Sequence, residues 1–138
     1  MGDDETFRAR RFGWTSLLAW AAAGLMIEGA QGFRVVRYMG DDLARTLLRL
    51  GHAHGVGLSL VVLVYSSAGV PLLSARPDGG RSVGRRMRVA AVMVPCGFAL
   101  SAFRHPEGDP SIAVLAVPIG AVLLLWALAS LARAAFRR

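Results

Sequence analysis

Residues 112–132 read IAVLAVPIGAVLLLWALASLA, a run of 21 positions without a charged side chain. A helix rises about 1.5 Å per residue, so this run is long enough to cross the roughly 30 Å hydrocarbon core of a bilayer. The run lacks the strict alternation of a barrel strand, and a helix satisfies all its own backbone hydrogen bonds in lipid. The sequence therefore predicts a transmembrane helix here.

Three further apolar segments precede this one, at about residues 14–33, 47–73 and 87–103. The first two are long enough to span a bilayer. The third is short, and we expect it to rely on Arg86 and Arg88 reaching the lipid headgroups. Residues 1–138 are thus predicted to form one all-α membrane domain, a four-helix transmembrane bundle.

The composition excludes several other classes of protein. The chain has 138 residues, of which 54% are hydrophobic and 18% charged. A soluble domain usually carries about 25% charged residues. The single cysteine, Cys96, cannot form an internal disulfide. The sequence contains no nucleophile elbow, phosphate loop or dinucleotide fingerprint, so an enzyme is the least supported class.

The basic residues determine the predicted orientation. The net charge is +7, and all 16 basic residues are arginines. They flank the apolar segments without interleaved aromatic residues, which argues against nucleic-acid binding and favours contact with anionic lipids. Eleven lie in the N-terminal tail, the second connection and the C-terminus, and five in the first and third connections. The positive-inside rule then predicts that both termini are cytoplasmic in a multi-pass protein of the bacterial inner membrane.

A signal peptide is the alternative interpretation of the first segment. The stretch from Glu28 to Ala30 makes a poor cleavage site, and removal would leave only three helices. We therefore expect the first segment to remain in the protein.

The two histidines at residues 52 and 54 form the strongest local motif. Asp41 or Asp42 can cap a helix that begins near Leu43, so both histidines should lie on its early turns. At 100° per residue their rings point about 200° apart. We expect His54 to face the bundle, on the same stripe as Leu47, Gly51 and Leu58.

These histidines suggest a metal site at the outer end of the bundle. We expect His54 and His105 as ligands, with Glu28 as a third ligand or an orienting partner. Imidazole and carboxylate ligands together suit zinc, copper or iron. Further possible ligands are His52 and Glu107, and the expected charge-balancing residues are Asp42, Arg45 and Arg49. A haem between His54 and His105, or a proton-responsive site, is a less favoured alternative.

The competing hypothesis is a non-catalytic membrane interaction or assembly subunit. Small residues allow helices to approach closely, and polar side chains then bond across the contact. The residues expected to pack helices are Gly51, Gly55, Gly97 and Ser101. The expected partners are membrane lipids, with a homodimer or a larger membrane complex also possible.

With His52-Ala53-His54 at the start of a membrane helix, the chain resembles small four-helix bacterial inner-membrane proteins of unknown function that carry a His-x-His at a similar place. The resemblance covers this motif and the helix count. It implies a bacterial inner-membrane location and no particular activity.

Overall fold

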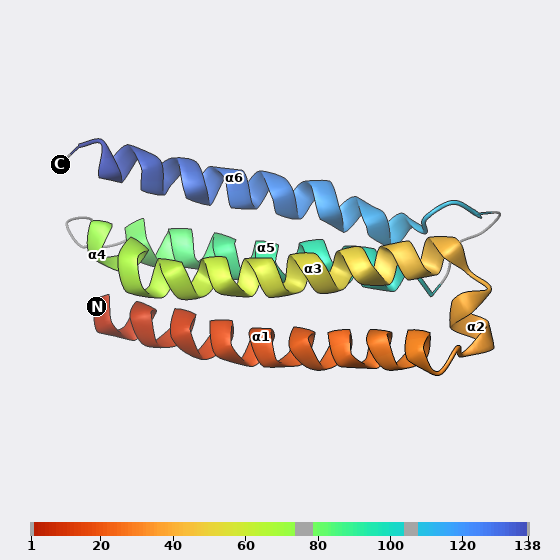
Figure 1. Cartoon of the computed structure of the whole chain (residues 1–138). Helices are drawn as coiled ribbons and strands as arrows, with labels where there is room; N and C mark the ends of the chain where they lie inside the picture. The colour runs from red at the N-terminus through yellow and green to blue at the C-terminus, as the bar shows by residue number, and fades with distance from the viewer. Residues whose placement is uncertain (1, 74–78, 104–107, 138) are drawn as a thin grey trace.

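The computed structural model describes residues 2–73, 79–103 and 108–137, and all regular structure within these ranges is helical. The long helices lie side by side (Figure 1). These are α1 (Gly2–Gly32), α3 (Asp42–Val64), α5 (Gly79–Ser101) and α6 (Ala116–Ala135). The shorter elements are α2 (Val36–Met39), a π-helical turn (Tyr65–Gly69), α4 (Val70–Leu72) and a 3₁₀ turn (Ile112–Leu115).

The long helices form a row in which successive helices run in opposite directions. α1 packs against α3, α3 against α5, and α5 against α6, which leaves α1 and α6 at the two flanks (Figure 1). One end of the row carries both chain termini and α4, and we call it the terminus end. The other carries α2 and the 3₁₀ turn, and we call it the α2 end. Side chains from distant parts of the sequence meet at each end.

The helices extend beyond the apolar segments that predicted them. α1 begins at Gly2, not near residue 14, because the hydrophilic residues before Trp14 continue the helix. Asp3, Asp4 and Glu5 occupy its first turn, where carboxylates interact favourably with the helix dipole. α5 begins at Gly79, not near residue 87, so its arginines lie within the helix. The apolar runs therefore predicted where the helices lie but not where α1 and α5 begin.

The start of α3 confirms the predicted cap. The Asp41 carboxylate accepts a 2.8 Å hydrogen bond from the Ala44 N–H, and the helix begins at Asp42. Near the other end, a π-helical turn precedes Pro71. Proline lacks an N–H and its ring crowds the carbonyl one turn earlier, and the wider π turn accommodates this. The helical path thus continues through α4 to Leu72.

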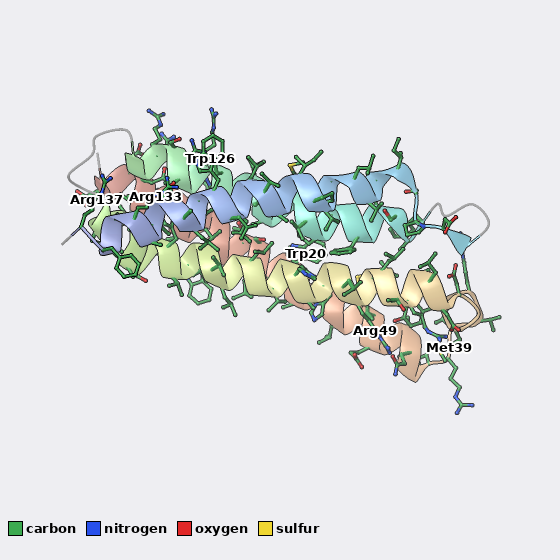
Figure 2. All side chains as sticks on the ribbon, turned by 90° about the horizontal axis from the view of Figure 1, so that it is seen from above. Trp20, Met39, Arg49, Trp126, Arg133 and Arg137 are labelled. Atoms are coloured by element: carbon green, nitrogen blue, oxygen red, sulfur yellow. The ribbon has the colours of Figure 1, made fainter. Side chains whose placement is uncertain are left out.

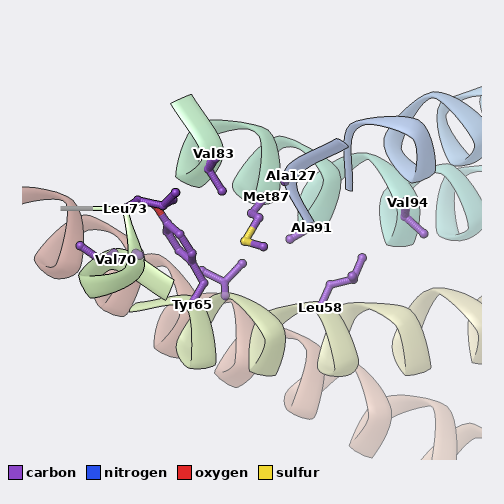
Figure 3. Close-up of a cluster of buried hydrophobic side chains, with 11 residues drawn as sticks. Leu58, Tyr65, Val70, Leu73, Val83, Met87, Ala91, Val94 and Ala127 are labelled. Atoms are coloured by element: carbon purple, nitrogen blue, oxygen red, sulfur yellow. The ribbon is translucent and has the colours of Figure 1, made fainter. Parts of the chain in front are cut away.

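The buried core lies mainly toward the terminus end. Figure 3 shows Leu58 of α3 and Tyr65 of the π-helical turn on the side that faces Met87 and Val94 of α5, and Ala127 of α6 belongs to the same cluster. On α6, the residues that pack toward this core repeat at alternating intervals of three and four, the period of one helix face. They are Val117, Gly120, Leu124, Ala127, Leu131 and Ala134.

Within the described residues, two helical segments are long and apolar enough to cross a membrane, Asp42–Leu72 and Ile112–Ala135. Only 11% of the most apolar stretch of Ile112–Ala135 is buried against the rest of the chain. Charged residues lower the hydropathy of the other two long helices, because Arg85, Arg86 and Arg88 lie within α5 and Glu28 within α1.

Candidate functional site

His52 lies at the contact between α3 and α1. Its Nδ1 is 2.8 Å from the Trp20 carbonyl oxygen of α1, and its side chain is half-buried. The ring rests against Gly24, where an added Cβ would collide with the imidazole. Because a carbonyl only accepts hydrogen bonds, Nδ1 must carry a proton. His52 therefore connects two helices by a bond to the backbone.

The expectation that His54 faces inward is wrong. Its side chain is exposed, although Leu47, Gly51 and Leu58 of the same stripe are buried. The His54 Nδ1 lies 2.8 Å from the Leu50 carbonyl oxygen one turn earlier, and its ring lies 5.1 Å from that of Phe98 in α5. His52 contacts α1, and His54 follows it by two residues. The side chain of His54 therefore points about 200° away from that of His52 around the helix.

The polar residues near the α2 end bond mainly to their neighbours. Arg45 donates to the Asp42 carboxylate and to the Met39 carbonyl. Arg49 donates to the Gln31 side chain of α1. Glu28 is exposed, and within residues 2–73, 79–103 and 108–137 it makes no hydrogen bond or ion pair. The arginines expected to balance a metal site thus bond to Asp42 and Gln31 instead of Glu28.

Two of the predicted ligands, His105 and Glu107, lie outside the described residues. Among those that are described, no group of three or more histidine, cysteine, aspartate or glutamate side chains is placed to hold a metal ion. The convergence of Glu28, His52, His54 and His105 therefore stays a prediction.

Glycines provide the closest helix contacts. Gly51 of α3 faces α5, where an added Cβ would lie 3.0 Å from the Pro95 carbonyl oxygen. Gly55 faces α1, and an added Cβ would collide with the Trp20 ring. Gly97 of α5 faces α6, with Val117 at 3.0 Å from such a Cβ. The Trp20 ring thus fills the space left at Gly55, whereas at Gly51 and Gly97 the neighbouring backbone approaches closely.

Serine hydroxyls bond within these contacts. Ser101 is fully buried, and its hydroxyl donates to the Gly97 carbonyl at 2.8 Å. Ser59 of α3 is also fully buried, and its hydroxyl lies 2.8 Å from that of Ser16 in α1. Both of these serine hydroxyls therefore have a hydrogen-bond partner.

Sequence reasoning missed the most buried charged group, which lies at the terminus end. Glu5 of α1 precedes all four apolar segments of the sequence, and its side chain is nevertheless only 6% exposed. Both nitrogens at the end of the Arg88 guanidinium donate to it, the second at 3.4 Å. This ion pair joins α1 to α5, and its two residues lie 83 positions apart in the sequence.

A glycine and a tyrosine enclose this ion pair. The Glu5 carboxylate lies against Gly84 of α5, where any Cβ would collide with it. The Tyr65 ring also contacts Gly84, and the Tyr65 hydroxyl donates to the Gly80 carbonyl. Tyr65 is 1% exposed. These contacts fasten α1, α5 and the π-helical turn that follows α3 together.

The sequence does contain a signal for this pair. One stripe of buried or half-buried residues runs along α1 at intervals of three or four, the spacing of a single helix face. It consists of Glu5, Ala9, Gly13, Ser16, Trp20 and Gly24. Extending the stripe toward the N-terminus would have placed Glu5 on the packed face.

Comparison with known proteins gives no matching family model, no similar curated protein and no similar solved structure.

Proposed function

We infer that this chain is a multi-pass membrane protein that acts as a non-catalytic assembly subunit. One observation carries the proposal: polar side chains at helix contacts bond to neighbouring helices. His52 bonds to the Trp20 backbone, Ser59 to Ser16, and Arg88 to Glu5. In lipid, such bonds and close glycine contacts hold helices together.

The exposed surface supports a location in lipid. α6 is the most apolar helix and is among the least buried, with Val122 and Leu125 more than 60% exposed. The opposite flank of the row also exposes apolar residues, because Leu18 and Leu25 of α1 are more than 70% exposed. Contiguous apolar surface of this kind marks a membrane or protein interaction site. Lipid, a second copy or another membrane protein would cover these flanks.

The distribution of arginines supports four crossings with both termini in the cytoplasm. The terminus end carries the starts of α1 and α5 and the end of α6, which hold nine of the described arginines, against four near the α2 end. The positive-inside rule assigns that end to the cytoplasm and the α2 end to the outer face. In a bacterium, this arrangement corresponds to the inner membrane.

His52→Ala is expected to destabilise the bundle by about 1–2 kcal/mol, because it removes an interhelical hydrogen bond and the side chain that packs on Gly24. His54→Ala is the matched control, since His54 bonds within its own helix and is exposed. Thermal unfolding of the purified protein in detergent measures both. Equal losses in the two variants would contradict the assigned role of His52.

Metal binding at the α2 end is the second candidate, and the tautomers of the histidines favour it. In His52 and His54, Nδ1 donates to a backbone carbonyl. The neutral ring then keeps its lone pair on Nε2, the atom that coordinates a metal. Zinc, copper or iron would suit these residues with Glu28, His105 and Glu107, and a haem is the less favoured cofactor.

One experiment separates the two candidates. Metal analysis and haem absorbance of the purified protein are measured before and after His54→Ala. The assembly proposal predicts that neither protein holds stoichiometric metal and that the variant keeps its unfolding temperature. About one equivalent of bound metal that is lost in the variant would establish the metal site instead.

A further inference from the structure

A polar pocket opens at the terminus end, between the first turns of α5 and the last turns of α6. Its volume is about 480 Å³, and its lining includes Arg86 of α5 with Arg133 and Arg137 of α6. Figure 2 shows Arg133 and Arg137 together near the C-terminus, with Trp126 further along the same helix. Three cationic side chains therefore surround one cavity.

These arginines have no carboxylate partner in the described part of the chain. The ion pairs there involve Arg8, Arg45 and Arg88. The Arg86 guanidinium carbon instead lies 4.0 Å from the centroid of the Trp126 ring, a cation–π contact that holds the side chain against one wall. Three uncompensated positive charges around one pocket favour an anionic ligand.

The pocket offers donors suited to phosphate. Guanidinium groups bind phosphate oxygens through paired, charge-assisted hydrogen bonds. The Ser82 hydroxyl also lines the pocket and has no hydrogen bond within residues 2–73, 79–103 and 108–137, so it can donate to a ligand. The Ser130 hydroxyl is already engaged, because it donates to the Trp126 carbonyl at 2.8 Å.

An apolar groove of about 450 Å³ adjoins the pocket, between the helical segment Asp42–Leu72 and the helices α5 and α6. At three places, a residue that lines the pocket is next in sequence to one that lines the groove. These pairs are Leu73 and Leu72, Arg86 and Met87, and Ser130 and Leu131. A cationic pocket that borders an apolar groove matches a ligand with a phosphate head and a hydrocarbon chain.

We propose that this pocket binds the phosphate group of an anionic phospholipid, with an acyl chain lying along the adjoining groove. The inference rests on the proposed location in a membrane, because the pocket would then open at the cytoplasmic headgroup layer. A soluble phosphate ester shares the head chemistry but cannot fill the groove. Bound lipid would join the ends of α5 and α6.

The test is native mass spectrometry of the full chain in dodecyl maltoside, with phosphatidylglycerol, phosphatidylcholine or inorganic phosphate added. One phosphatidylglycerol should remain bound in preference to the other two. Arg133→Gln combined with Arg137→Gln should weaken its binding roughly tenfold or more, because charge-assisted hydrogen bonds are lost. Arg10→Gln with Arg11→Gln is the control, since it removes equal charge at the same end outside the pocket, and should change binding by less than about twofold.

Equal losses in the two double variants, or no retained phosphatidylglycerol, would overturn the proposal. Inorganic phosphate binding as tightly as the lipid would support the arginine pocket and overturn the acyl-chain groove. Alkaline carbonate extraction of membranes that contain the wild-type protein tests the membrane location separately from lipid binding. Release of the protein by carbonate would refute the membrane location. Binding of inorganic phosphate to the purified protein reports on the arginine pocket independently of that location.

Discussion

Arg88→Ala is expected to destabilise the folded chain by about 3–5 kcal/mol, the largest loss expected from a single polar substitution here. The substitution leaves the Glu5 carboxylate without its cation, and that side chain is only 6% exposed. Glu5 cannot turn toward water easily, because it is short and lies against Gly84. Chemical unfolding in mixed micelles, followed by circular dichroism, measures the loss.

Two further variants distinguish an ion pair from simple packing. Glu5→Gln should cost less than Arg88→Ala, because the long Arg88 side chain, 19% exposed, can extend its charge into water. Replacing both partners, Glu5→Leu with Arg88→Met, should recover much of the stability, since no buried charge remains. A double variant as unstable as Arg88→Ala would show that the charges are not what matters.

Gly55→Leu is expected to separate α1 from α3 and to cost at least about 1–3 kcal/mol, because the new side chain occupies the volume of the Trp20 ring. The Trp20 ring packs between the helices, so either the ring or the whole of α1 must move. Thermal unfolding measures the stability. A disulfide between cysteines introduced by Ser16→Cys and Ser59→Cys in a Cys96→Ser background reports the helix contact, and it should form less efficiently in the variant.

Gly57→Leu is the matched control, two residues along the same helix. No atom lies within 4 Å of a Cβ added at Gly57. The added side chain would project from an exposed position of the helix, where leucine is favoured over glycine, so stability should stay the same or rise by up to about 1 kcal/mol. If Gly57→Leu proved as harmful as Gly55→Leu, the loss would not depend on the contact with Trp20.

Local signals in the sequence predicted local structure well. The all-helical fold follows from the long apolar runs, and the start of α3 follows from Asp41. The orientation of the two histidines was harder to predict. A stripe drawn through Leu47 and Gly51 included His54, although His52 is the residue that reaches α1. Rotating α3 by a fraction of a turn about its axis would place His54 instead of His52 against α1. The packing of α3 against its neighbours decides which histidine faces them.

The Glu5–Arg88 pair was missed for a different reason. Glu5 lies outside the apolar runs and Arg88 lies at the edge of one, where charged side chains are expected to be solvated. Their meeting depends on α1 and α5 extending past those runs and on Gly84 leaving space for the carboxylate. Helix extension is a local property, whereas the pairing of two helices far apart in sequence is not encoded in either one alone.

Labelling of single cysteines in a Cys96→Ser background tests most directly which side of the membrane the helix connections face. Met39→Cys, Ser82→Cys and Asp109→Cys place a thiol in the first connection, at the start of α5 and in the third connection. With a membrane-impermeant maleimide on intact cells, the proposed topology predicts labelling at residues 39 and 109, and at residue 82 only after permeabilisation. Labelling of residue 82 in intact cells, or protection of residues 39 and 109, would contradict it.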